Sequence, residues 1–393
     1  MKKVAALLLT SIALQNMGAQ SFIQAYEDRA DMVTQANITT NLQEFAGFGV
    51  KKTGTTANTN ALDWLKNKYL SYGYTASNMS EDTFTYGSST SKNLIITKTG
   101  NVYPNKYVII CGHYDTIVGP GVSDNGSGTS IILEAARILK NIPTEYSIKF
   151  IHFSGEEQGL VGSSHYVNNV AYQNGSQVLD IKLVLNIDQV GGLIGNNNNT
   201  ITCERDTGGV SSNNTASNAV TQELMNCTTL YSPLQTHLSY AYSSDYMPFE
   251  AKGYTITGFY EYLRSENEHT VNDTFANLDP VYIFNVGKAA VGALQHFAVA
   301  STASNLLSTN DTSLQKSGEA IRVYPNPAKD LVTVEFQQKV KEFKVEVNDM
   351  AGNTVLSFEN QEKINTSALE NGVYTFTIKT DKGNTTKKII INK

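Results

Sequence analysis

The chain has few cysteines, little glycine and proline, and no excess of positive charge. Three cysteines among 393 residues are too few for a disulfide scaffold, and the absence of a CxxC pair excludes a cysteine zinc site or a redox motif of that type. Glycine (29) and proline (8) are too sparse for a fibrous chain. Thirty basic and 36 acidic residues give a net charge of −6, which does not indicate a nucleic-acid partner.

The N-terminal segment has the pattern of a secretory signal peptide. Lys2 and Lys3 precede an apolar stretch over residues 4–14, and small residues follow at Gly18 and Ala19. The stretch is too short to span a bilayer, and no later run approaches ~18 apolar residues. We therefore expect residues 1–20 to be a signal peptide and the rest of the chain to be secreted, without a transmembrane segment.

After this segment, apolar strands alternate with helices. Strands are predicted over residues 93–97, 107–112, 147–153, 182–187 and 254–259, and helices over 60–70, 130–139, 162–169 and 289–300. The alternation predicts an α/β three-layer domain with a mainly parallel or mixed central sheet. In such sheets, functional side chains gather at the carboxyl ends of the strands.

The pattern changes beyond residue 300. Residues 301–318 have no periodicity and are predicted to be a linker. Short alternating strands with turn signals such as Asn371-Gly372 follow, and they predict a small all-β sandwich. The predicted organisation is a signal peptide (1–20), an α/β domain (21–300), a linker (301–318) and a β-sandwich domain (319–393).

Histidines and carboxylates follow the predicted strand ends of the α/β domain. They are His113, Asp115, Asp124, Glu156, Glu157, Asp188 and His269. Imidazole nitrogen and carboxylate oxygen are the ligands of zinc in hydrolytic sites. Two zinc ions need five ligands, one of them bridging, and a base that is not a ligand. Five of these residues can serve as the ligands, namely His113, Asp124, Glu157, Asp188 and His269, and Glu156 is left as the base.

Two further features favour a metal site. Adjacent Glu156 and Glu157 would repel each other beside a buried strand unless cations lie near them. Asp115, two residues after His113, is spaced to accept the second ring N–H and to orient that ligand. Each residue alone has an ordinary interpretation as a turn, a cap or an exposed side chain, but their order and their common position at strand ends favour the site.

We expect structural roles for the remaining histidines and for the cysteines. Packing or surface positions are expected for His152, His165, His237 and His296. Cys111 is expected to be a buried thiol, while Cys203 and Cys227 could pair in an oxidising compartment. No GxSxG, HExxH or P-loop motif is present, so these motifs do not suggest another enzyme class.

The motifs at the strand ends resemble those of a known enzyme family. Residues 112–116 (GHYDT), 123–128 (SDNGSG) and 154–163 (SGEEQGLVGS), then Asp188 and His269-Thr270, follow in this order within residues 40–300. The set is similar to that of the secreted di-zinc aminopeptidases of the bacterial leucyl aminopeptidase type. Members of this family remove single residues from a free peptide N-terminus.

The resemblance implies a role for each residue. His113 and Asp188 would hold one zinc ion, Glu157 and His269 would hold the other, and Asp124 would bridge them. Glu156 would be the general base toward a water that bridges the ions. The chain departs from the family near the substrate pocket, where members often have a histidine in place of Tyr246 and a tyrosine just before it. Tyr240 and Tyr242 are offset from that tyrosine and are the candidates for substrate binding.

The C-terminal segment resembles a second family. Residues 323–327 (VYPNP), 348–352 (NDMAG), 371–374 (NGVY) and 387–389 (KKI) look like the type A sorting domain of the type IX secretion system. The resemblance implies the type IX secretion machinery as a partner, and a protein that is secreted or attached to the cell surface. A carbohydrate- or partner-binding β-module is the alternative.

The sequence thus predicts a secreted zinc aminopeptidase with two zinc ions that acts on peptides or proteins with a free N-terminus. A carboxypeptidase, a dipeptidase or a glutaminyl cyclase could use the same metal site. A surface binding protein with a decayed peptidase domain is the non-enzyme alternative, and the presence of all six candidate ligands and base disfavours it.

Overall fold

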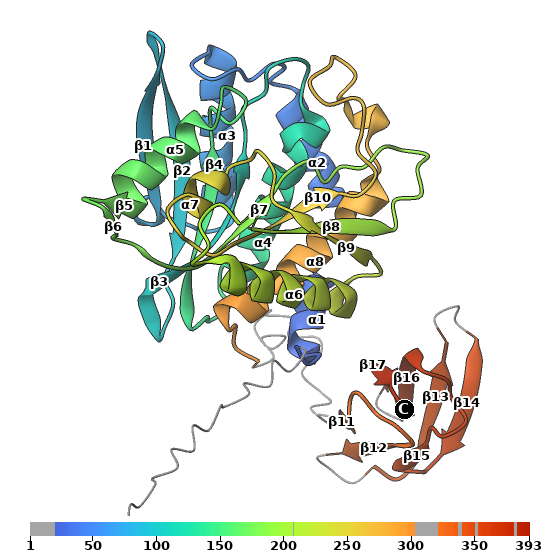
Figure 1. The fold of residues 1–393 in the computed structure, drawn as a ribbon. Coiled ribbons are helices and arrows are strands. Elements are labelled where there is room, and N and C mark those ends of the chain that lie inside the picture. The colour runs from blue at the N-terminus through green and yellow to red at the C-terminus, as the bar shows by residue number, and fades with distance from the viewer. Residues whose placement is uncertain (1–19, 207, 303–320, 337–339, 350–352, 381–382) are drawn as a thin grey trace, which may run out of the picture. The chain divides into compact units, whose positions relative to one another are not determined.

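The structure is a computed structural model that describes residues 20–206, 208–302, 321–336, 340–349, 353–380 and 383–393 (Figure 1). Residues 1–19 of the predicted signal peptide and residues 303–318 of the predicted linker lie outside this part of the chain. The chain divides into two units near residue 303. No helix among the described residues is both long enough and apolar enough to cross a membrane.

A mixed sheet of eight strands forms the centre of the first unit. The spatial order is β1 (Met79–Tyr86), β2 (Ser89–Lys98), β4 (Tyr146–Phe153), β3 (Tyr103–His113), β7 (Asp180–Ile187), β10 (Ile256–Glu261), β8 (Thr200–Arg205) and β9 (Gln235–Tyr240). The four middle strands β4, β3, β7 and β10 are parallel, whereas β2 and β8 join them antiparallel. The carboxyl ends of the parallel strands therefore meet at one edge of the sheet.

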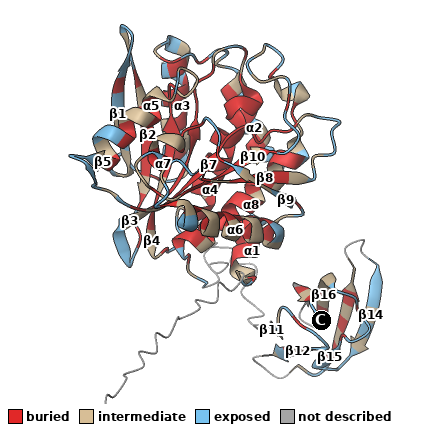
Figure 2. Cartoon of the chain, in the orientation of Figure 1, coloured by how far each residue is buried: buried red, intermediate tan, exposed pale blue. Residues whose placement is uncertain are grey.

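Helices cover both faces of this sheet, which confirms the predicted α/β class. One face contacts α3 (Thr56–Ser71), α4 (Gly128–Leu139), α6 (Asn214–Tyr231) and α8 (Pro280–Ala298), with α1 (Gln24–Ala30) and α2 (Gln35–Ala46) packed against these helices. On the other face, α5 (Val161–Tyr166) and α7 (Met247–Glu250) bury Tyr166 and Phe249 against Ile109 and Cys111 of β3. Figure 2 shows the buried residues concentrated in the central strands and in the helices against them.

Short elements complete the first unit. They are η1 (Ala76–Asn78), η2 (Val122–Ser127), η3 (Val167–Ala171), η4 (Phe275–Asn277) and the small hairpin of β5 (Tyr172–Gln173) and β6 (Ser176–Gln177). The predicted helix over 289–300 is the second half of α8. Its true start is set by Asp279, whose side chain caps the backbone N–H groups of Val281 and Tyr282, with Pro280 in the first turn.

The second unit consists of two antiparallel sheets. One contains β11 (Ile321–Tyr324), β12 (Leu331–Phe336) and β15 (Lys363–Asn365), and the other contains β14 (Thr354–Glu359), β13 (Phe343–Asn348), β16 (Gly372–Thr380) and β17 (Gly383–Ile391). Both sheets contribute alternate side chains to one core, for example Val332 and Val334 from β12 and Val345 and Val347 from β13. The C-terminal unit is therefore a β domain, as predicted.

The first unit should depend on the packing of β3. Ile110 is fully buried in this central strand, whereas Ile194 lies in a loop with 55% of its surface exposed. We expect Ile110→Ala to lower the free energy of unfolding by about 2–5 kcal/mol, because it removes buried methyl groups and leaves a cavity. Ile194→Ala is the matched control and should change it by less than about 0.5 kcal/mol. Urea unfolding followed by the fluorescence of Trp64, the single tryptophan, reports on this unit. Equal effects of the two variants would contradict this account of the core.

Candidate metal centre

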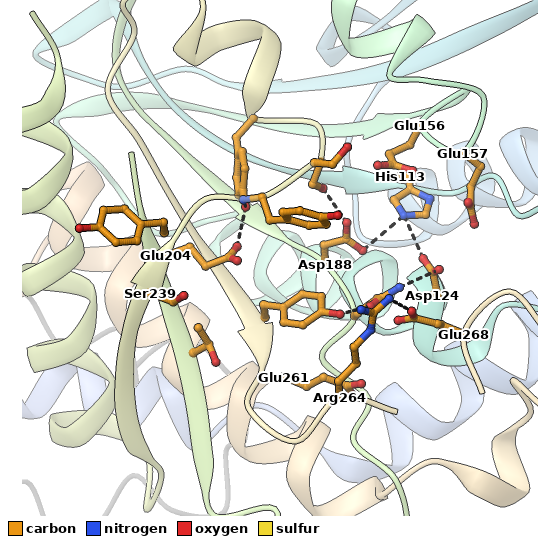
Figure 3. Close-up of a pocket in the computed structure, with 18 of the residues that line it drawn as sticks. His113, Asp124, Glu156, Glu157, Asp188, Glu204, Ser239, Glu261, Arg264 and Glu268 are labelled. Atoms are coloured by element: carbon orange, nitrogen blue, oxygen red, sulfur yellow. Dashed lines mark hydrogen bonds and ion pairs between the residues drawn. The ribbon is translucent and has the colours of Figure 1, made fainter. Parts of the chain in front are cut away.

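The residues predicted to bind metal come together at the carboxyl edge of the sheet. Figure 3 labels His113, Asp124, Glu157 and Asp188 among them. His113 ends β3, Glu157 follows β4, Asp188 follows β7, Asp124 lies in η2 and His269 lies in the loop after β10. They form two groups of potential ligand atoms, each within 4.8 Å: His113, Asp124 and Asp188 in one, and Asp124, Glu157 and His269 in the other.

Asp124 is the residue that the two groups share. Its Oδ1 lies 3.2 Å from His113 Nε2, and its Oδ2 lies 3.0 Å from His269 Nε2. His113 Nε2 is also 3.3 Å from Asp188 Oδ1, and His269 Nε2 is 2.9 Å from Glu157 Oε2. The two oxygens of Asp124 thus face different histidines, as a carboxylate between two cations would require.

Asp115 has a position that differs in part from the prediction. Its backbone carbonyl, rather than its carboxylate, lies within hydrogen-bond distance of His113 Nδ1, at 3.1 Å. The nearest carboxylate oxygen is 3.7 Å from that nitrogen, which is too far for a hydrogen bond. The carboxylate instead accepts the backbone N–H groups of Glu156 (3.2 Å) and Glu157 (3.3 Å). Asp115 therefore holds the loop that carries both glutamates.

The electrostatics of the site fit a bound cation. Burial raises the pKa of Glu156 to about 10, although His113 opposes the shift, and Asp188 adds to it. Burial and the neighbouring Asp124 raise the pKa of Glu157 to about 8. Burial would also raise the pKa of Asp124, but its contacts with His113 and His269 outweigh this effect and hold the pKa below its usual range. Carboxylates crowded together away from water need positive charge nearby, and the nitrogen and oxygen donors here suit zinc.

Several residues that hold these ligands were not identified from the sequence. Ser244 Oγ donates to Asp188 Oδ2 at 2.6 Å, and Gln189 Nε2 donates to Asp124 Oδ2 at 2.8 Å. Asp273 accepts the backbone N–H groups of Ser123 and Asp124 at 2.7 and 2.9 Å. Gln189 and Ser244 each stand next to an acidic residue in the sequence, but Asp273 lies in a polar loop without a recognisable signal.

The centre opens into a cavity of about 810 Å³. Tyr240 and Tyr242, the candidates for substrate binding, line this cavity with 56% and 75% of their surfaces exposed. His237 on β9 also lines the cavity, and its ring packs against that of Tyr262. The packing role expected for His237 is therefore found in the wall of the cavity. Glu156 lies in the cavity wall beside the two ligand groups and belongs to neither.

The other histidines and the cysteines are structural. His152 and His296 contact the hydroxyl groups of Tyr69 and Tyr231 at 2.9 and 2.7 Å, and His165 lies 3.1 Å from the carboxylate of Asp82. Cys111, Cys203 and Cys227 are free and buried thiols, so Cys203 and Cys227 do not pair.

Comparison with protein families agrees with this geometry. Residues 93–294, just over half of the chain, match peptidase family M28. The chain belongs to peptidase family M28. The M28 match contains His113, Asp124, Glu156, Glu157, Asp188 and His269. Residues 322–392 match the secretion system C-terminal sorting domain, which covers nearly all of the β domain.

Individual relatives are similar to parts of this M28 chain. Aminopeptidase YwaD of Bacillus subtilis (strain 168) is 42% identical over 108 residues, which make up 27% of this chain and 23% of YwaD. The chain thus spans about a quarter of the length of this curated relative.

Solved structures share the fold. The LapA aminopeptidase of Legionella pneumophila has a TM-score of 0.63 and 22% identity, with coverage of 76% of this chain and 80% of LapA. The glutaminyl cyclase of Porphyromonas gingivalis has a TM-score of 0.54 and 19% identity, with coverage of 67% and 99%. At these identities the likeness shows the fold alone.

Glu204 is a further buried carboxylate in the cavity wall. It lies on β8 with 6% of its surface exposed, and it accepts a hydrogen bond of 2.6 Å from Tyr246 Oη. Burial raises its pKa to about 8, against the effect of this hydrogen bond, and the charge of Asp188 adds to the rise. The folded chain therefore binds a proton at Glu204 at pH values where the unfolded chain has released it.

This proton binding predicts a pH-dependent effect of Glu204→Gln on stability. As the pH rises from about 4.5 to 8, the wild type should lose stability relative to the variant, because the unfolded state releases the proton first. The slope should be at most ~1.4 kcal/mol per pH unit. Urea unfolding of both proteins at pH 5 and pH 8 measures it. A difference in stability that is the same at both pH values would contradict the prediction.

Proposed function

We propose that this chain is a secreted zinc aminopeptidase, which hydrolyses the bond after the first residue of peptides or proteins with a free N-terminus. The observation that carries the proposal is the pair of ligand groups that share Asp124, with the carboxylate of Glu156 beside them in an open cavity. Membership of family M28 supports it, and so does the similarity to proteins named as aminopeptidases.

The donor set suits two zinc ions. We infer that His113 and Asp188 would hold one ion, that Glu157 and His269 would hold the other, and that Asp124 would be a ligand of both. Zinc bound here would polarise the substrate carbonyl and make water a stronger nucleophile. Ser244 and Gln189 would orient Asp188 and Asp124 through the hydrogen bonds described above.

Glu156 is the proposed general base. Its carboxylate takes a proton from the water that attacks the carbonyl carbon, and a bond forms between that carbon and the water oxygen. When the peptide C–N bond breaks, Glu156 returns the proton to the leaving amine. The positive charge of zinc ions bound at the neighbouring ligands would lower the raised pKa of Glu156, so that Glu156 could act as a base near neutral pH. The Asp115 carboxylate keeps the backbone of Glu156 in place.

The C-terminal domain supports the secreted location. Its match to a secretion sorting domain agrees with the type IX sorting domain predicted from the sequence, and the N-terminal signal-peptide pattern fits the same route. We propose that the type IX machinery exports the protein, which is then released or held at the cell surface.

The base is tested by Glu156→Gln, which keeps the shape of the side chain and removes its basicity. We expect kcat on aminoacyl amides to fall by about 10²–10⁴-fold, because proton transfer contributes about that much. Zinc content, measured by atomic emission, should stay near the wild-type value, since Glu156 belongs to neither ligand group.

Glu266→Gln is the matched control, because Glu266 is exposed in the loop that also carries His269. It should leave kcat unchanged. Retained activity in Glu156→Gln would exclude the proposed role of this residue. The substrate panel also includes C-terminally free peptides and peptides with N-terminal glutamine. A preference for the former would indicate a carboxypeptidase or dipeptidase, and a preference for the latter would indicate a glutaminyl cyclase.

The sharing of Asp124 predicts a difference in metal stoichiometry between two variants. His269→Ala removes a ligand from one group, so it should lower zinc content from about two ions per chain to about one. Asp124→Ala removes a ligand from both groups and should lower the content of both ions. Zinc analysis after dialysis distinguishes the variants, and loss of a single ion in Asp124→Ala would contradict the shared role.

A further inference from the structure

The lining of the cavity beside the proposed metal centre combines polar groups with tyrosine rings. Among the described residues that line it, Leu160 has the one aliphatic side chain, and the others are mainly acidic, hydroxylic or tyrosine residues. The tyrosine rings supply apolar surface to the cavity, and the carboxylates supply negative charge. Such a lining suits a long side chain that has an apolar stem and a polar or charged end.

Glu204 lies where it can bind the charged end of such a substrate side chain. It lies on β8, two strands away from β7, after which Asp188 follows. In Figure 3, Asp188 lies between Glu204 on one side and Asp124 and Glu157 on the other. Glu204 belongs to neither ligand group, so its carboxylate is not occupied by the proposed metal ions.

The carboxylate of Glu204 has a fixed donor but no cation. Tyr246 Oη donates to Glu204 Oε2, and the same hydroxyl accepts the backbone N–H of Tyr242 at 2.8 Å, which fixes its orientation. Within the part of the chain that the structure describes, no lysine, arginine or histidine forms an ion pair with Glu204. Arg264, the arginine of the cavity lining, pairs with Glu268.

The neighbouring buried acid Glu261 is satisfied differently. It accepts the backbone N–H groups of Gly192 at 2.8 Å and Ser265 at 2.5 Å, which hold the chain around it. The carboxylate of Glu204, in contrast, accepts no such backbone N–H groups among the described residues, and its hydrogen bond comes from Tyr246. A buried carboxylate is costly unless a cation or several donors accompany it. A proton removes this cost while the cavity is empty, and a cation that enters the cavity on the open side of Glu204 would stabilise the ionised carboxylate in its place.

We propose that Glu204 selects substrates whose first residue is lysine or arginine, by pairing with the ammonium or guanidinium group of that side chain. The inference rests on the proposed aminopeptidase function and names its substrate class. The aliphatic stem of the bound side chain can lie along exposed tyrosine rings of the cavity such as Tyr242, while its charged end reaches the buried carboxylate.

The experiment compares lysyl and methionyl amides, because the two side chains are of similar length and only lysine carries a charge. For the wild type we expect kcat/KM to be at least about tenfold higher for the lysyl amide. Glu204→Gln should lower this ratio by about tenfold or more, to a value near one, since a buried charge pair loses one partner. Glu204→Asp keeps the charge and should retain part of the preference. Glu266→Gln is the control and should leave the ratio at the wild-type value.

Two outcomes would overturn the inference while the enzyme stays active. If Glu204→Gln leaves both rates, and therefore the ratio, unchanged, Glu204 does not select the side chain. If it lowers both rates equally, Glu204 acts on a group that all substrates share, such as the α-amine, or it acts on the structure alone.

A binding measurement separates this inference from the proposed function. Lysinamide and methioninamide are titrated into the zinc-loaded Glu156→Gln protein, with and without Glu204→Gln. We expect lysinamide to bind at least about tenfold more tightly, and this advantage to disappear in the double variant. Equal affinities would overturn the selectivity of Glu204. Failure of the wild type to hydrolyse any aminoacyl amide, with the lysinamide advantage still present, would refute the aminopeptidase function and leave the cation site at Glu204 supported.

Discussion

The collection of carboxylates at one edge of a parallel sheet is the constraint on which the site depends. Glu157 follows β4 and Asp188 follows β7, the two strands on either side of β3, and Asp124 lies in the turn before α4. Their charges repel one another, and burial makes that repulsion stronger because little water remains to screen it. Within the folded chain, the histidines His113 and His269 contact these carboxylates. The site is therefore built for more positive charge than the chain supplies, which is the basis for assigning it to metal ions.

The surrounding chain opposes this repulsion by holding the backbone rather than by adding cations. Asp115 and Asp273 are both buried, and each accepts two backbone N–H groups from the segments that carry the ligands. Ser244 and Gln189 hold individual ligand oxygens. These contacts are made by the chain itself, so they hold the segments that carry the candidate ligands close together.

Local patterns in the sequence predicted the central strands β2, β3, β4, β7 and β10, but not β1, β8 or β9. Apolar runs define β3 and β4, and the acidic or imidazole residues that follow them are adjacent in sequence to the strand ends. The partners of these ligands could not be found in the same way. Whether the carbonyl or the carboxylate of Asp115 meets His113 depends on the course of one turn, and the bond from Ser244 to Asp188 joins residues 56 positions apart. Periodicity contains no information on such contacts.

The position of Glu204, and with it the proposed specificity, depends on strand order, which the sequence pattern does not predict. Because β8 pairs antiparallel with β10, Glu204 lies beside Gly258. A Cβ atom at residue 258 would lie 2.8 Å from a ring carbon of Tyr246, so glycine leaves the space in which this ring packs. The hydroxyl of Tyr246 can then hold Glu204. The proposed metal ligands belong to the parallel part of the sheet and Glu204 to its antiparallel part, so substitutions on β8 can change the preferred substrate without displacing the ligands.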